Sequence, residues 1–263
     1  MPNTKIADSC VYRQKHFSDM MLRKIIAVVA AVAMAMGAVA QVPDNDNISI
    51  QIADSASPFY YPNLMLRYKE GKPLTAEEYH YLYYGYAYQP EYKPLEANSG
   101  MNRVQTIMAR LAIDEPSVSD IDELIAAGME AMERDPFSPQ LLNIMAYAYG
   151  TSGDKEREKA YYDRLNGVLN TIAASGDGLK EKSPMHIIMF SHGLDYIASK
   201  DWKYLKGRII SRTVEFVPFT VPHDKVKGYY FDYSRVYWNK PDGYVFKRER
   251  TWQINNMKPR YYK

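Results

Sequence analysis

Cysteine is almost absent from this sequence. Its 263 residues include one, Cys10, and Cys10 precedes a segment that we expect to be removed from the mature chain. A chain without cysteine forms no disulfide, has no thiol nucleophile and holds no thiolate-bound zinc or iron–sulfur centre. The sequence therefore excludes these kinds of site from the mature protein.

Long apolar runs are missing as well. The run at residues 25–36 has 12 residues, whereas a helix needs about 20 to cross a membrane. It follows an Arg-Lys pair and precedes an A-x-A motif at residues 38–40, which is the three-part pattern of a secretory signal peptide. We therefore predict a signal peptide over residues 20–40, cleaved after Ala40, and no transmembrane segment.

This prediction places the mature protein outside the cytoplasm, either periplasmic or secreted. Residues 1–19 then form an upstream extension. Residues 41–57 are polar and lack periodicity, so we expect a flexible segment with a short strand at residues 48–52. The rest suits one domain, with a helical part at residues 58–178 and a strand-rich part at residues 179–263.

Basic and acidic residues nearly balance in this sequence, except near the C-terminus. Residues 1–40 hold five of the 33 basic and two of the 31 acidic residues, so the mature chain is nearly neutral. Ten basic residues nevertheless lie between residues 225 and 263, interleaved with aromatic residues. That mixture is typical of surfaces for single-stranded nucleic acid. Because we expect export, no nucleic-acid partner is predicted, and an anionic glycan or an acidic protein is the alternative.

Tyrosine is abundant, and seven tyrosines fall between residues 73 and 94. Thr75, followed three residues later by Glu78, is the pattern of a capping box that starts a helix. The apolar and aromatic residues then surround nearly the whole helix. Such a helix either packs between other elements or offers tyrosines to a ligand.

The candidate binding surface combines three tyrosines on the flanks of this helix with three basic residues near the C-terminus. These residues are Tyr81, Tyr84, Tyr88, Lys247, Arg248 and Arg250. The alternative for the C-terminal residues is a set of strands with aromatic side chains inward and charges outward.

Helical spacing dominates the first half of the mature chain. We expect helices at residues 59–70, after a cap at Asn98 or Ser99, after a cap at Ser119, from Pro139, and from Asp154. Strands are expected at residues 185–190, 208–217, 226–237 and 243–252, with a helix at residues 191–198. The predicted fold class is α+β, with an N-terminal layer of antiparallel helical hairpins followed by a C-terminal antiparallel sheet.

Two histidines, His186 and His192, lie near Ser191 and Asp195. Adjacent serine and histidine side chains do not normally form a productive triad, and no G-x-S-x-G motif is present. We interpret His186 as a partly buried strand residue and His192 as a cap or surface residue. The sequence predicts no catalytic residue, no metal site and no cofactor, and it does not favour an enzyme.

Two resemblances add to this interpretation. Residues 119–165, with Leu142, Ala146, Tyr149 and Tyr162 in the helical hairpin, are similar to a tetratricopeptide repeat. The L-T-x-x-x-Y-x-x-L-Y-Y-G core at residues 74–85, with the DPFSPQLL and GYYFDYSRVY segments, resembles a family of secreted Bacteroides-type proteins catalogued as a domain of unknown function. This resemblance implies export and no particular activity.

The sequence thus leads to one hypothesis and two alternatives. The first is a non-enzymatic envelope or secreted interaction protein that binds a protein partner. The alternatives are a glycan-binding module that uses exposed tyrosine and tryptophan, and a hydrolase that would need His186 or His192 near a carboxylate in a cleft.

Overall fold

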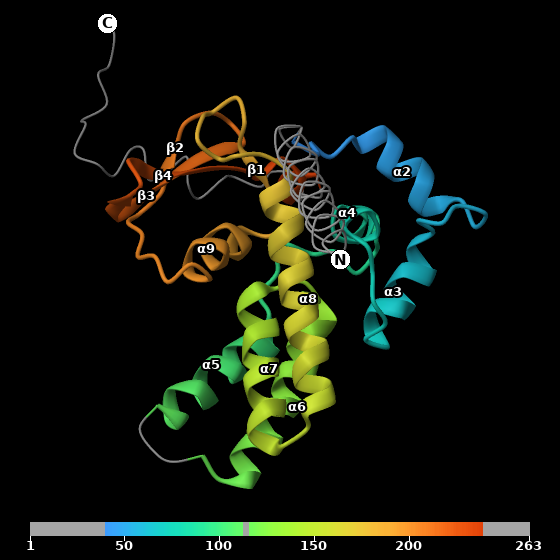
Figure 1. Cartoon of the computed structure of the whole chain (residues 1–263), viewed down its shortest axis with the longest axis vertical. Helices are drawn as coiled ribbons and strands as arrows, with labels where there is room; N and C mark the ends of the chain where they lie inside the picture. Colours follow the sequence, from blue (N-terminus) through green and yellow to red (C-terminus); the bar gives the residue numbers. More distant parts are fainter. Residues whose placement is uncertain (1–39, 113–115, 239–263) are drawn as a thin grey trace, which may run out of the picture. The chain divides into compact units, whose positions relative to one another are not determined.

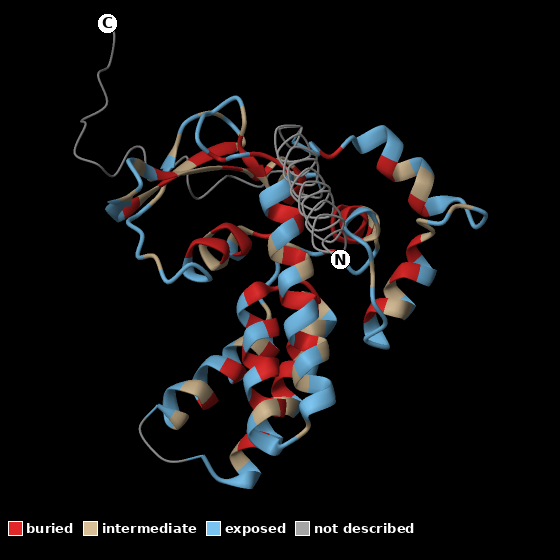
Figure 2. Cartoon of the chain, viewed as in Figure 1, coloured by how far each residue is buried: buried red, intermediate tan, exposed pale blue. Residues whose placement is uncertain are grey.

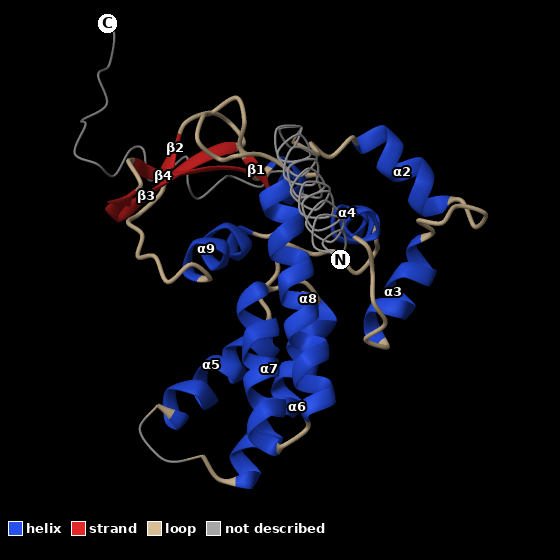
Figure 3. Cartoon of the chain, in the orientation of Figure 1, coloured by secondary structure: helices blue, strands red, loops and turns tan. Residues whose placement is uncertain are grey.

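The computed structural model describes residues 40–112 and 116–238. Helices come first and a small sheet follows (Figures 1 and 3), so the predicted α+β class is confirmed. The helical part contains α2 (Asn45–Ala53), α3 (Tyr61–Lys69), α4 (Ala76–Gly85), a short 3-10 helix (Tyr86–Tyr88), α5 (Ser99–Leu111), α6 (Val118–Arg134), α7 (Pro139–Ser152) and α8 (Lys155–Ala174). The second part contains β1 (Met185–His186), α9 (Phe190–Ala198), β2 (Arg208–Ile209), β3 (Val214–His223), β4 (Val226–Asp232) and a 3-10 helix (Ser234–Tyr237).

Side chains at the helix ends set most of these boundaries. Thr75 and Glu78 form the predicted capping box at the start of α4, and Asn98 caps α5. The cap of α6 is Ser117, which forms a capping box with Asp120, so the prediction of Ser119 was two residues late. Ser117 is the cap because Asp120 follows three residues later, so that each side chain accepts a hydrogen bond from the backbone N–H of the other residue.

The aromatic helix α4 packs inside the molecule, where it contacts α2, α3 and α8. Leu82, Tyr83 and Tyr84 have no exposed surface, and Figure 2 shows most of α4 as buried. A helix that is apolar nearly all round requires neighbours on several sides. Packing is therefore the main role of its tyrosines.

The segment expected to be flexible, residues 41–57, contains helix α2 instead of a strand. Asp44 caps α2 by accepting hydrogen bonds from the backbone N–H groups of Asp46 and Asn47. Ile48 and Ile52, four residues apart, are buried on its inner face. The prediction was wrong because two apolar residues in a polar segment suffice for a helix that packs against other elements.

Helices α5 to α8 form successive antiparallel hairpins, in which α5 packs on α6, α6 on α7, and α7 on α8. The first of these contacts is close, because a Cβ atom on Gly100 would lie 2.5 Å from the backbone nitrogen of Ala131. The last hairpin turns at Gly153, whose φ of 88° is in the left-handed region that glycine adopts without strain. Within the described ranges, none of the helices has the length and apolar character required to cross a membrane.

The sheet has the strand order β1-β4-β3-β2 and is mixed. The pairs β4–β3 and β3–β2 are antiparallel, as expected, whereas β1 pairs parallel with β4. The strand predicted at residues 208–217 is two strands joined by a turn, and β3 and β4 are joined by a turn at Asp224 and Lys225, both with positive φ. The strand predicted at residues 243–252 lies outside the described residues.

Candidate functional site

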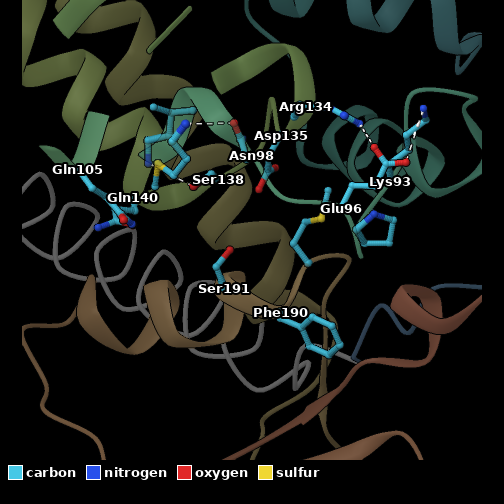
Figure 4. Close-up of a pocket in the computed structure, with 14 residues that line it drawn as sticks. Lys93, Glu96, Asn98, Gln105, Arg134, Asp135, Ser138, Gln140, Phe190 and Ser191 are labelled. Atoms are coloured by element: carbon cyan, nitrogen blue, oxygen red, sulfur yellow. Dashed lines mark hydrogen bonds and ion pairs between the residues drawn. The ribbon is translucent and has the colours of Figure 1, made fainter. Parts of the chain in front are cut away.

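A pocket of about 280 Å³ lies among α5, α7 and α9, next to the segment that connects the 3-10 helix to α5. Helix α5 contributes Met101 and Gln105, α7 contributes Gln140 and Leu141, and α9 contributes Phe190 and Ser191. The end of α6 and the segments before α5 and α9 complete the lining. Figure 4 shows Asp135, at the end of α6, and Ser191 approaching this space from opposite sides.

The charged groups at one side of the pocket pair with one another. Glu96 accepts from Arg134 at 2.7 Å and lies 3.7 Å from the Lys93 ammonium (Figure 4). All three side chains are about half exposed, so these contacts contribute little to stability, about 0–1 kcal/mol each. They connect the segment at the edge of the pocket with the end of α6.

A buried chain of hydrogen bonds lies behind the pocket. The Tyr83 hydroxyl is 2.8 Å from His192 Nδ1, and His192 Nε2 is 3.0 Å from an oxygen of Asp135. A carboxylate only accepts, so His192 Nε2 carries a proton, and in the neutral ring Nδ1 accepts from the Tyr83 hydroxyl. Burial raises the pKa of Tyr83, which keeps this hydroxyl protonated. The chain joins α4, α9 and the end of α6.

We interpreted His192 from the sequence as a cap or surface residue, and this interpretation was wrong. Its side chain has no exposed surface, and both ring nitrogens are used inside the protein. Its partners Asp135 and Tyr83 lie 57 and 109 residues away in sequence, so no local motif could have indicated them. His192 has no free nitrogen with which to activate a nucleophile in this arrangement.

The triad that Ser191, His192 and Asp195 invite is not formed, because the carboxylate on His192 belongs to Asp135. Asp195 instead accepts a hydrogen bond of 3.4 Å from the backbone N–H of Gln140, in the first turn of α7. Burial raises the pKa of Asp195 to about 6. Asp195 thus links α9 to the N-terminus of α7, where the helix dipole favours a negative charge.

His186 lies in β1 and is partly buried, as predicted. Its Nδ1 is 3.9 Å from a carboxylate oxygen of Asp232 in β4. Burial lowers the pKa of His186, and the nearby Asp232 opposes this shift. In the part of the chain that the structure describes, no three histidine or acidic side chains gather in a way that would hold a metal ion.

The three tyrosines predicted for a binding surface donate their hydroxyl groups to other residues of the protein. Tyr81 donates to Asn47 at 2.7 Å, and its ring stacks on Phe59 at 4.0 Å. Tyr88 donates to the carbonyl of Asn45 at 2.8 Å. These two tyrosines hold α2 in place.

Tyr84 is fully buried and donates to the carbonyl of His186 at 3.0 Å. It therefore cannot face a ligand, because the flank of α4 on which it lies is covered by β1. The basic residues of the predicted surface, Lys247, Arg248 and Arg250, lie outside the described residues.

Comparison with protein families identifies the family of this chain. The model of a protein family described as "Domain of unknown function (DUF4919)" matches residues 46–241. No curated protein and no solved structure matches the chain. The matched range contains every element of the pocket and of the buried hydrogen-bond chain, and it begins six residues after Ala40.

Proposed function

This chain belongs to the family of the domain of unknown function DUF4919, and we propose that it is an exported, non-enzymatic interaction protein. In this proposal, the pocket among α5, α7 and α9 binds an extended segment of a partner protein. The observation that carries the proposal is that α5 and α7, the first helices of successive hairpins, both line the pocket.

Export is supported by the position of the predicted leader relative to the fold. The compact unit that contains all the described elements begins at Ala40, the residue after which we expect cleavage. The signal pattern thus lies ahead of the fold, as it does in precursors whose leader is removed. The resemblance to secreted Bacteroides-type proteins belongs to the same proposal.

The helical arrangement supports a protein partner. Proteins built from stacked helical hairpins present the first helix of each hairpin on one face, and that face commonly binds extended segments. Helices α5 and α7 have this position here, and both line the pocket. We therefore include a tetratricopeptide-like hairpin stack in the proposal, with α9 extending the same face.

The size and chemistry of the pocket favour a short segment. About 280 Å³ is near the lower end of small-molecule sites, so one or two side chains fit and a folded domain does not. Gln105 and Gln140 are exposed amides at its edge, and amides both donate and accept hydrogen bonds. A peptide backbone needs both kinds of partner.

The two alternatives are less well supported than a protein partner. A hydrolase would need His186 or His192 near a carboxylate in a cleft. His192 is fully buried and hydrogen-bonded to Asp135, and His186, although 3.9 Å from Asp232, does not line the pocket. A glycan module would need a site with exposed tyrosine or tryptophan. Tyr81, Tyr84 and Tyr88 make hydrogen bonds within the protein, and the exposed Tyr147, Tyr162, Tyr204 and Trp238 do not line the pocket.

Site-specific photo-crosslinking in cells that export the protein tests the proposal. A crosslinking residue at Gln140 should give an adduct of defined mass, because Gln140 lines the pocket. The matched control is a crosslinking residue at Lys159, which is exposed on α8 and lies outside the pocket lining. A Ser191→Arg substitution should abolish the adduct by filling the pocket. An exported, folded protein that yields no adduct from Gln140 or Gln105 would overturn the proposal.

A further inference from the structure

The first residue after the predicted cleavage point already has a defined contact. The backbone nitrogen of Gln41 donates to the carbonyl oxygen of Ala174 at 2.7 Å. Ala174 is the last residue of α8, whereas Gln41 directly follows the predicted signal peptide. Segments far apart in sequence therefore meet at the site where processing would leave a new chain end.

The C-terminal end of α8 is suited to a positive charge. The last carbonyl groups of a helix have no partner within it, and together they carry about half a negative charge. Helix α8 has 20 residues and no basic residue in its last turn. The Ser175 side chain donates to the carbonyl of Ile172, and Gln41 donates to that of Ala174. Neither donor is charged in the uncleaved chain.

The residues after Gln41 are held in place independently of this contact. Pro43 is buried, and its carbonyl accepts from Arg235 Nη2 at 3.2 Å. The side chain of Asn45 accepts from the same guanidinium group, and its carbonyl accepts from Tyr88. Because Pro43 and Asn45 are fixed, the nitrogen of Gln41 stays near Ala174 whether or not a residue precedes it.

We propose that cleavage after Ala40 leaves the α-ammonium group of Gln41 bound to the C-terminal end of α8, so that removal of the leader completes the fold. Hydrolysis of the Ala40–Gln41 peptide bond adds one water, which gives a carboxylate on the released leader and an ammonium group on Gln41. The ammonium group is charged at neutral pH, and it replaces a neutral N–H donor at the negative end of the helix. Processing thus adds an electrostatic contact that the precursor lacks.

This proposal rests on the export that is part of the proposed function, but its central test does not. Two versions are produced inside cells as cleavable fusions. One begins at Gln41 after removal of the fusion, and the other retains Gly-Ser-Ala ahead of Gln41. Both keep a hydrogen-bond donor at Gln41, whereas only the first has the charge beside Ala174. We expect the first to melt about 1–4 °C higher at low salt.

Salt separates the charge from other effects of the extension. The difference in melting temperature should shrink in 1 M sodium chloride, where charges are screened within about 3 Å. Equal melting temperatures at low salt, or a difference that salt leaves unchanged, would overturn the proposed contact regardless of export.

A second measurement addresses processing itself. Mass spectrometry of the protein recovered after export should find Gln41 as the first residue with a free α-amino group. A different first residue, or a Gln41 cyclised with loss of ammonia and therefore uncharged, would overturn the proposal even if the protein is exported. The melting comparison and this measurement thus distinguish failure of the contact from failure of export.

Discussion

At the scale of single residues, His192 uses both ring nitrogens for hydrogen bonds that stabilise the fold. Its two nitrogens tie α4 and the end of α6 to α9 through Tyr83 and Asp135. Removing one partner of a buried hydrogen bond leaves the other unsatisfied, which costs more than the bond itself contributes. The free energy of unfolding should therefore be sensitive to substitution of either hydrogen-bond partner of His192.

Tyr83→Phe should reveal this sensitivity. The substitution leaves His192 Nδ1 buried without a donor, so the free energy of unfolding should fall by about 1–3 kcal/mol. Urea unfolding measures the change. Tyr147→Phe is the matched control, because Tyr147 is 44% exposed, and it should change stability by less than about 0.5 kcal/mol. Equal effects of the two substitutions would show that the hydrogen bond to His192 contributes nothing.

A second residue-scale prediction concerns the partly buried carboxyl group of Asp195. Because its folded pKa is raised to about 6, the folded protein binds this proton more tightly than the unfolded chain does. The contribution to stability is fully present below the unfolded pKa, near pH 4, and is lost as the pH rises through 6. The stabilising effect of acid should therefore be on the order of 1–3 kcal/mol for this group.

Asp195→Asn isolates this contribution, because asparagine keeps an acceptor for the Gln140 N–H but does not titrate. The stability of the natural protein minus that of the variant should rise as the pH falls from 7.5 to 4. Urea midpoints of both proteins across this range give the difference, and other titrating groups cancel. A difference that grows with rising pH would contradict the assigned pKa.

At the scale of elements, two serines two residues apart, Ser117 and Ser119, test where α6 begins. Ser117→Ala should lower the free energy of unfolding by about 0.5–2 kcal/mol, because it removes the acceptor for the Asp120 N–H. Ser119 lies inside the first turn of the same helix, so Ser119→Ala should have little effect. Thermal melts of the two variants compare positions two residues apart. A larger effect at Ser119 would place the cap where the sequence alone suggested it.

The elements that the sequence predicted correctly have local causes. The capping box of Thr75 and Glu78, the cap at Asn98 and the glycine turn at Gly153 all act within a few residues. By contrast, α2 forms because Ile48 and Ile52 pack against residues that are distant in sequence. Periodicity in its polar sequence is weak, and only the tertiary contacts decide between helix and flexible chain.

The candidate site was less predictable than the fold for the same reason. The pocket gathers residues from α5, α7 and α9, and nothing in their sequence spacing indicates that they meet. The sequence predicts a helix end at Asp135, but it led us to interpret its partner His192 as a cap or surface residue. An aspartate that ends a helix and a histidine within an apolar segment are each ordinary, and only their juxtaposition has meaning.

At the scale of the whole molecule, Arg235 joins the two ends of the described fold. This residue was counted with the basic C-terminal surface, yet it is 2% exposed. Its guanidinium group donates to Pro43 and Asn45, about 190 residues away, and lies over the rings of Tyr84 and Trp238. Burial lowers its pKa, although an arginine remains charged at neutral pH. The start of α2 thus depends on a residue beyond the last strand.

Arg235→Met should release the start of α2 while leaving the helical hairpins folded. Methionine fills much of the volume but donates no hydrogen bond, so stability should fall by about 1.5–3 kcal/mol. Hydrogen exchange should quicken at residues 45–53 before it changes in α6 to α8. Arg208→Met is the control, because Arg208 is exposed on β2, which pairs with β3, and its guanidinium group contacts the ring of Phe216. Uniformly faster exchange throughout the protein would mean that Arg235 supports the whole core. Unchanged exchange in α2 would mean that other contacts hold the start of α2 in place.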